Sequence, residues 1–387
     1  MSLPLAGTLV LDLSRVLAGP YCTMVLADLG ARVIKIESSD GGDDARHIGP
    51  FVTDAEGAMH SAYFASLNRG KESLALDLKA AGDRRILDAL LARADVLVEN
   101  FRPGVMDRLG YGWDSLHRRF PALIHAAISG FGQTGPYRDR AAYDMVVQAM
   151  GGIMSVTGHP GGPPARVGSS IGDITAGLFA ATGINAALAE RARTGRGRLV
   201  DVAMLDSQIA ILENAIARYQ AIGQAPGPLG ARHPSITPFA AFRARDGHLV
   251  IAAGNDALFR RLCDVLHCPE MAADARFLTN DLRTDNHAAL NDAIEAALAS
   301  DTVADWLARL ETAGIPAGPI NDIPAALADP QVRARNMVVT SDLPGGGRLA
   351  MAGNPVKLDG VADAPTRPPA PALDADRARI LEELGLD

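Results

Sequence analysis

The 387-residue sequence has few cysteines, few aromatic side chains and no long apolar run. Its three cysteines, Cys22, Cys263 and Cys268, are odd in number and match neither zinc-ligand nor redox spacing, so we expect free thiols and no metal site. No uncharged apolar run reaches about 18 residues, the length that spans a bilayer, and the first residues lack a cationic segment. We therefore expect a cytoplasmic protein without a membrane span.

The sequence also lacks an excess of basic residues. Lys and Arg number 37 against 45 Asp and Glu, for a formal net charge of −8. A nucleic-acid binder or a protein bound to anionic lipid needs a basic face, so both classes are disfavoured. With 48% hydrophobic residues and this length, the composition is that of a soluble globular enzyme of two lobes.

Short β-prone runs alternate with helical stretches in the first part of the chain. We predict strands over residues 8–13, 32–37, 74–77, 95–99, 123–129 and 198–203, and helices over 19–30, 82–94, 173–194 and 205–221. Strand, helix and strand in close succession form a βαβ unit, which implies a parallel sheet. The sequence therefore predicts an α/β fold, a Rossmann-like doubly wound large domain.

Glu37 ends the second strand, where dinucleotide-binding folds hold a ribose-binding acid, and this position suggests a dinucleotide-binding function. However, the first turn, residues 14–20, lacks the spaced glycines that let a pyrophosphate approach the backbone. Pro20 in that turn also removes an amide donor. We therefore reject a nicotinamide-binding site.

A loop rich in Gly, Pro and Arg over residues 223–238 marks a domain boundary. After it we predict a hairpin of residues 239–243 and 248–253, then helices over 256–266, 288–299 and 303–313. This predicts a smaller α+β domain. The expected domains are 1–222, 223–325 and a return segment 326–387 that completes the large domain, with an extended Pro-rich stretch over 365–371 and a last short helix.

Asp173 follows a Gly/Pro-rich loop and opens a helix whose apolar residues recur at three- and four-residue spacing up to residue 194. At or next to the N-cap, its carboxylate would meet free amides and the positive end of the helix dipole, so we expect it to be ionised at neutral pH. Asp is also a favoured N-cap residue, and simple capping is the competing interpretation.

Several blocks in a fixed order resemble one family, the class III CoA-transferases, which include formyl-CoA transferase and carnitine CoA-transferase and are related to α-methylacyl-CoA racemase. The blocks are RVLAGP at 15–20, GARVIKIE at 30–37, NRGK at 68–71, VENFRPG at 98–104, GQTGP at 132–136, Gly172-Asp173 and GIPAGP at 314–319. The resemblance implies an interlocked homodimer of ring-like chains, with the active site between the large lobe of one subunit and the small lobe of the other.

The resemblance also implies that Asp173 is the nucleophile. It attacks the thioester of a donor acyl-CoA to give a mixed anhydride, and the CoA thiolate converts this into an aspartyl-CoA thioester. The acceptor acid then attacks, and CoA returns to the new acyl group. Coenzyme A enters as a substrate, and neither a tightly bound cofactor nor a metal is expected.

Alignment of the same blocks implies a set of CoA contacts: Val16, Leu76, Lys79, Asn100, Phe101, Arg108 and Tyr143. Backbone amides of residues 16–19 are candidates to stabilise tetrahedral oxyanions, and a tight strand-to-helix connection is the alternative interpretation. An Arg often found after the second strand is replaced by Ser38. Phosphate anchoring is therefore expected to fall to Arg46, Arg69 or Lys71.

Two other functions compete with CoA transfer. A racemase on the same scaffold would use an Asp and a His as bases, but this chain has Tyr143 in the corresponding segment, and a Tyr is a poor proton acceptor near pH 7. Tyr143 therefore favours transfer. A silent CoA-binding subunit is disfavoured by the intact Gly172-Asp173 pair.

The substrate is predicted from a few residues. Leu17 replaces a polar Gln of formyl-CoA transferases and residues 229–235 lack their run of glycines, which disfavours formate and oxalate. Candidates to hold the distal carboxylate of a diacid, or else ordinary solvated charges, are Arg15, Arg166, Arg232 and His233. We expect succinyl-CoA as donor and a small diacid such as itaconate, mesaconate, citramalate or glutarate as acceptor, with a carnitine-like or bile-acid-like acceptor left open.

Overall fold

The computed structural model describes residues 3–386 and divides into two compact units. Unit 1 contains the residues up to Met154, Arg166–Gln224, and the chain from Asp329 onward. Unit 2 contains Ser155–Ala165 and Ala225–Ala328. The domain boundaries expected from the sequence are 1–222, 223–325 and 326–387, and they remain a prediction.

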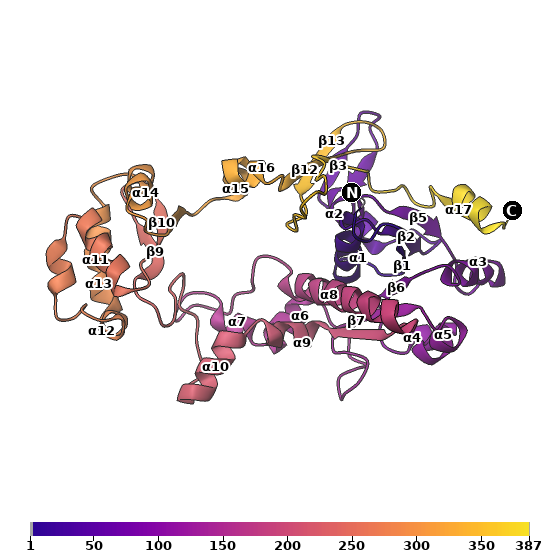
Figure 1. Cartoon of the computed structure of the whole chain (residues 1–387), viewed down its shortest axis with the longest axis horizontal. Helices are drawn as coiled ribbons and strands as arrows, with labels where there is room; N and C mark the ends of the chain where they lie inside the picture. Colours follow the sequence, from indigo (N-terminus) through magenta and orange to yellow (C-terminus); the bar gives the residue numbers. More distant parts are fainter. Residues whose placement is uncertain (1–2, 387) are drawn as a thin grey trace. The chain divides into compact units, whose positions relative to one another are not determined.

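Unit 1 is built on a parallel sheet of six strands, which lie in the order β5-β2-β1-β6-β7-β8 (Figure 1). In chain order this is 3-2-1-4-5-6, the order of a Rossmann-like doubly wound sheet, so the predicted fold class is confirmed. The direction of winding reverses between β1 and β6. The strands are β1 (Leu9–Asp12), β2 (Arg32–Glu37), β5 (Glu72–Ala75), β6 (Val96–Glu99), β7 (Ile124–Ser129) and β8 (Leu199–Ala203).

Helices cover both faces of this sheet because its strands are apolar on both sides. Val10 on β1 packs in a core with α1 and α8, whereas its neighbour Leu11 packs in a second core with α3, α5 and α17. Eleven α-helices lie wholly in the described part of unit 1: α1 (Ala18–Asp28), α2 (Ala62–Asn68), α3 (Ala81–Leu91), α4 (Val105–Leu109), α5 (Trp113–Arg119), α6 (Asp144–Met150), α8 (Ile171–Thr194), α9 (Met204–Ala210), α10 (Glu213–Ile222), α16 (Pro330–Ala334) and α17 (Arg377–Leu384).

Helix α8 runs along α1, α6 and α9 within unit 1 (Figure 1). It ends where Gly195 adopts a left-handed conformation with φ 69°, a common C-terminal stop for a helix. By length and composition alone α8 could span a membrane, which is also true of many core helices of soluble proteins. Its side chains Ala176, Ala180 and Ile184 are buried in the core shared with α1.

The predicted long helix over residues 205–221 is wrong, because the structure has two helices there. Helix α9 ends at Ala210, and α10 (Glu213–Ile222) begins after Ile211 and Leu212. The Leu212 amide donates to the carbonyl of Ile209, three residues back, so the regular four-residue ladder is interrupted. No Gly or Pro marks this break, which is why the sequence pattern did not show it.

Smaller sheets in unit 1 were not predicted. Strands β3 (Phe51–Thr53) and β4 (Met59–Ser61) form a hairpin next to the short 3₁₀ helix η1 (Asp44–His47). Farther along, β12 (Val338–Asp342) pairs with β13 (Arg348–Ala352) and, in parallel, with β14 (Thr366–Arg367). The stretch over residues 365–371, expected to be extended, therefore contains a short strand.

Unit 2 is the predicted α+β lobe. The expected hairpin is present as β9 (Phe239–Arg243) and β10 (His248–Ala252), and a third strand, β11 (Ala317–Pro319), joins the other side of β10. The helices pack their apolar faces on this sheet around Phe242, Phe259 and Trp306. These packed helices are α11 (Asp256–Val265), η2 (Pro269–Ala273), α13 (His287–Leu298) and α14 (Val303–Thr312). Unit 2 also contains α12 (Asn280–Asp285), whose buried residue is Arg283, and α15 (Ile323–Ala328), which has no buried residue, and α7 (Ile153–Val156) lies at the boundary of the two units in the chain.

Candidate active site

The turn between β1 and α1 lies at the carboxyl edge of the parallel sheet, next to the point where its winding reverses. Ligands of doubly wound folds bind at this edge. Val16 in this turn has φ 66°, in the left-handed region that β-branched residues rarely adopt. Backbone strain of this kind costs about 1–3 kcal/mol and persists only where the surroundings hold it. The turn is therefore a candidate for function.

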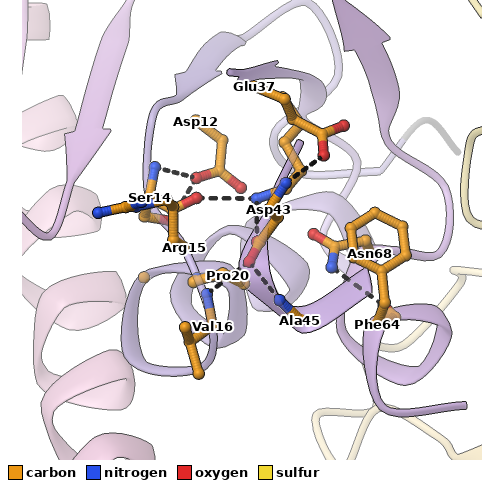
Figure 2. Close-up of polar contacts among 12 residues, drawn as sticks. Asp12, Ser14, Arg15, Val16, Pro20, Glu37, Asp43, Ala45, Phe64 and Asn68 are labelled. Atoms are coloured by element: carbon orange, nitrogen blue, oxygen red, sulfur yellow. Dashed lines mark hydrogen bonds and ion pairs between the residues drawn. The ribbon is translucent and has the colours of Figure 1, made fainter. Parts of the chain in front are cut away.

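Side chains from three different segments hold this turn. The amides of three successive residues donate to side-chain oxygens. Ser14 donates to Asp12 Oδ1 at 3.0 Å and Val16 to Asp43 Oδ1 at 3.0 Å (Figure 2). Arg15 donates to Asn100 Oδ1 at 2.8 Å. Since the Val16 amide is occupied, the expected set of oxyanion donors over residues 16–19 is wrong at residue 16. The amides of residues 17–19, at the N-terminus of α1, have no acceptor within the helix.

Ion pairs without solvent contact lie directly behind the turn. Lys35 Nζ is 2.8 Å from Asp43 Oδ2, and Lys71 Nζ is 2.9 Å from Asp12 Oδ2; all four side chains are fully buried. Burial by itself would raise the pKa of Asp12, but the attraction of Lys71 and Lys35 outweighs it and lowers that pKa. Asp12 therefore stays ionised under the turn.

The expectation that Arg46, Arg69 or Lys71 anchors a phosphate is not supported. Arg46 makes two bonds to Glu37, at 2.8 and 2.7 Å. Arg69 is 3% exposed and pairs with Asp28 at 2.7 Å, and Lys71 is enclosed with Asp12. Because buried carboxylates already neutralise these cations, a phosphate would have to displace them, and for Arg69 and Lys71 the expectation is wrong.

Asp173 is the third residue of α8 rather than its N-cap, which is Ser170. One turn farther along the same face, Gly177 is so close to α1 that an added Cβ would lie 2.7 Å from the Ala18 carbonyl oxygen. The face of α8 that carries Asp173 is therefore packed against the start of α1. The tertiary structure thus places the helix face that carries the predicted nucleophile on the first turn of α1.

The electrostatic surroundings of Asp173 differ from the expectation. Asp144 on α6 accepts the Gly172 amide at 2.8 Å, so it caps α8 from outside the helix. The side chain of Gln148 holds Asp144 at 2.7 Å. Burial and then repulsion by Asp144 raise the pKa of Asp173 to about 7. The expectation of a fully ionised carboxylate at neutral pH is therefore wrong, because desolvation and a like charge outweigh the helix dipole.

Tyr63 on α2 joins Asp173, Asp144 and Asp43 in one electrostatic cluster, and it was not identified from the sequence. Burial and the charges of Asp173, Asp43 and Asp144 raise the pKa of Tyr63 to about 12. Its hydroxyl thus stays protonated and can donate a hydrogen bond beside Asp173. The residues of this cluster come from separate segments of the chain, so no local motif could have revealed it.

The side chains expected to contact CoA all follow strands at the carboxyl edge. Asn100 donates to the Arg15 carbonyl at 2.7 Å, and the Arg15 guanidinium lies 5.7 Å from the centroid of the Phe101 ring. These residues and Val16 therefore form one group at the switch point. Leu76, which is buried, and Lys79 follow β5, the exposed Arg108 ends α4, and Tyr143, 79% exposed, directly precedes α6.

The candidate carboxylate-binding residues fall in different units. Arg15 is exposed and pairs with Asp44 at 3.5 Å, and Arg166 lies 3.8 Å from Asp144. Arg232 and His233 belong to unit 2. Among residues 3–386, three or more His, Cys, Asp or Glu side chains do not come together as a metal-ligand group.

Comparison with known proteins assigns a family. The model of CoA-transferase family III matches residues 5–377. The chain is 49% identical to acetyl-CoA:oxalate CoA-transferase of Acetobacter aceti, covering 98% of this chain and 95% of that protein, and 40% identical to succinate–glutarate CoA-transferase of Agrobacterium fabrum, covering 98% and 96%. A crystal structure of a CAIB/BAIF family protein from Brucella suis matches with a TM-score of 0.87 at 40% identity, covering 99% and 100%. The chain belongs to CoA-transferase family III, as the sequence motifs predicted.

Proposed function

We propose that this enzyme transfers CoA from a donor acyl-CoA to a small carboxylic acid through a thioester on Asp173. The observation that carries the proposal is the packing of the Asp173 face of α8 on the N-terminus of α1, whose amides lack helix acceptors. Amides without helix acceptors are donors suited to an oxyanion, and this supports a reacting carboxyl group on that face of α8. Family membership supports the same chemistry.

The proposed cycle uses the carboxylate form of Asp173. An oxygen of Asp173 attacks the thioester carbon, the C–S bond breaks, and the CoA thiolate departs. The product on Asp173 is a mixed anhydride. The thiolate attacks the aspartyl carbonyl, which releases the donor carboxylate and forms aspartyl-CoA. The acceptor carboxylate attacks this thioester, and the released thiolate then takes the acceptor acyl group and frees Asp173. The Tyr63 hydroxyl and the amides of residues 17–19 stabilise the oxyanions.

The proposed CoA contacts are the seven residues implied by the family motifs. The group at the switch point, Val16, Asn100 and Phe101, is held together by the Arg15 backbone and guanidinium. Lys79 and Arg108 are exposed cations that follow β5 and β6 and can pair with phosphates. Carboxylates already occupy Arg69 and Lys71. Phosphate binding, the role of the Arg that is missing at residue 38, therefore falls to Lys79, Arg108 and Arg15.

For the acceptor we propose a small dicarboxylate, with succinyl-CoA as donor. Succinate–glutarate CoA-transferase of Agrobacterium fabrum carries such a pair in its name. Acetyl-CoA and oxalate are the second candidate pair, because the Acetobacter aceti protein is 49% identical over nearly the whole chain. This similarity weighs against the prediction from Leu17 that oxalate is disfavoured.

The covalent step is tested by trapping. Incubation with succinyl-CoA should leave CoA bound to Asp173, seen as a mass increase that hydroxylamine removes and that Asp173→Ala lacks. Failure to label the wild-type enzyme with succinyl-CoA or acetyl-CoA would contradict the mechanism. Deuterium incorporation at the α-carbon without acyl exchange would instead support a racemase, and CoA binding without exchange in the wild type would support a silent subunit.

The acceptor is tested by exchange. We expect CoA esters of glutarate, mesaconate, itaconate or citramalate to form from succinyl-CoA. Faster formation of oxalyl-CoA from acetyl-CoA would select the second pair. Absence of exchange with all these acids would overturn the dicarboxylate proposal and leave the family assignment intact.

We also propose that the enzyme is a cytoplasmic homodimer. Helices α6, α8 and α9 present an apolar face of exposed side chains, which are Met145, Val146, Leu178, Phe179 and Ile209. In α10, whose ten residues are all described, not one is buried, and Ile216, Tyr219 and Ile222 are exposed. Exposed large apolar side chains on neighbouring helices are typical of an interface. The second copy implied by the family motifs is the occupant that we propose.

A further inference from the structure

The buried pair Lys35–Asp43 has no role in the proposed cycle, yet it touches the strained turn at two points. Lys35 Nζ donates to the Ser14 carbonyl at 2.8 Å and is 2.8 Å from Asp43 Oδ2. Asp43 Oδ1 accepts the Val16 amide at 3.0 Å (Figure 2). Both side chains are fully buried. One ion pair therefore ties the turn at its first residue and at its strained residue.

Asp43 is itself fixed from several sides. Its Oδ1 also accepts the Ala45 amide at 2.9 Å, and its own amide donates to Glu37 Oε2 at 3.0 Å. Glu37 in turn is held by Arg46 and by the Ser73 hydroxyl at 2.6 Å. The carboxylate that receives the Val16 amide therefore has little freedom to move, and it can fix the position of that amide.

The conformation of Val16 decides where the next amides point. A valine at φ 66° is in an unfavourable conformation, and the hydrogen bond from its backbone amide to Asp43 compensates for this cost. The amides of Leu17, Ala18 and Gly19 follow directly, and Pro20 supplies none. The first bond within the helix runs from the Tyr21 amide to the Leu17 carbonyl at 2.7 Å. A rotation at Val16 would change the direction in which these free amides point.

We propose that Asp43 is a positioning residue of the reaction: it holds Val16 in its left-handed conformation and thereby aims the amides of residues 17–19 at the oxyanion formed on Asp173. The inference rests on the proposed function and adds the element that orients its oxyanion donors. Lys35 is the counter-ion that allows a carboxylate to sit in this position without solvent.

The test compares two double variants that differ only in the acceptor at residue 43. Lys35→Met with Asp43→Asn removes both buried charges and keeps an oxygen for the Val16 amide. Lys35→Met with Asp43→Leu removes the charges and the oxygen at nearly the same side-chain size. We expect kcat for exchange, and the single-turnover rate of thioester formation on Asp173, to be about 10- to 100-fold lower in the Leu variant than in the Asn variant. KM for the donor should change little.

A control variant separates positioning from stability. Arg32→Met with Glu72→Leu removes a bidentate pair from the opposite end of the same strand β2, with bonds at 2.9 Å. It should lower the melting temperature and leave kcat of the folded enzyme unchanged. Equal kcat values for the Asn and Leu variants, measured where circular dichroism shows both folded, would overturn the proposal. Absence of thioester in the wild-type enzyme would instead contradict the proposed function.

Discussion

At the residue scale, the surroundings of Asp173 disfavour the ionised form of its carboxyl group. Its pKa is raised to about 7 from an ordinary value of 3.8, because of burial and the charge of Asp144. The folded protein therefore binds a proton there that the unfolded chain has released, between about pH 4 and 7. Stability from this group is present below that window and falls as the pH rises through it.

Replacing Asp173 by Asn should therefore stabilise the enzyme while abolishing exchange. At pH 8 we expect a gain on the order of 4 kcal/mol in the free energy of unfolding, because the pKa of this carboxyl lies about three units above its ordinary value, and little gain at pH 4, because the native carboxyl is then neutral. Urea unfolding at both pH values measures this difference. An equal gain at both would contradict the raised pKa.

The same ionisation predicts the pH dependence of catalysis. The nucleophile must be deprotonated, so kcat/KM for the donor should rise with pH with a midpoint near 7. Asp144→Asn keeps an oxygen for the Gly172 amide but removes the negative charge, and should lower the midpoint by up to about one unit. Asp342→Asn, which changes an exposed carboxylate, serves as control. A midpoint that does not move in Asp144→Asn would exclude Asp144 as a cause.

At the element scale, the contact of α1 with α8 positions the helix face that carries Asp173, the proposed nucleophile. Gly177 allows the close approach, since a Cβ would meet the Ala18 carbonyl oxygen at 2.7 Å and the Cys22 amide nitrogen at 3.3 Å. The side chains of both helices at this contact are small, as in Ala18, Ala176 and Ala180. The two helices can therefore approach this closely because residue 177 has no Cβ.

Gly177→Ala should separate the two helices. We expect a loss of about 1–3 kcal/mol in stability and a fall in kcat, because Asp173 moves away from the turn. Thermal unfolding and steady-state exchange are the measurements. Gly82→Ala on α3, where a Cβ meets nothing within 4 Å, should change neither kcat nor the structure. Normal kcat in Gly177→Ala would show that the approach of α1 does not govern catalysis.

At the scale of the whole molecule, the apolar face of α6, α8 and α9 predicts association. Phe179→Glu places a charge in this face, where Phe179 is 42% exposed, and should convert a dimer into monomers with little effect on folding of the chain. Light scattering after size exclusion measures the mass. Met59→Glu, at a 70% exposed residue of β4, is the matched control. A monomeric wild-type enzyme would contradict the dimer.

The sequence alone determined the family, the parallel α/β architecture and the nucleophile candidate Asp173, because these depend on local periodicity and on motifs in a fixed order. It was wrong where neighbours distant in sequence decide. Asp144, which raises the pKa of Asp173, reaches α8 from α6, and the carboxylates that occupy Arg69 and Lys71 come from β1 and α1. The break between α9 and α10 likewise carries no turn residue.

Only the tertiary structure decided the electrostatics of the site and the conformation of its turn. Nothing in the sequence distinguishes Val16 from an ordinary strand or helix residue. In the structure, Asp43, Asn100 and Lys35 hold the turn around it, and Val16 has a left-handed conformation. The physical reason is that burial and charge act through space. A local pattern records which side chains are available, whereas packing determines which of them share one solvent-free volume and so which are ionised, paired or free to react.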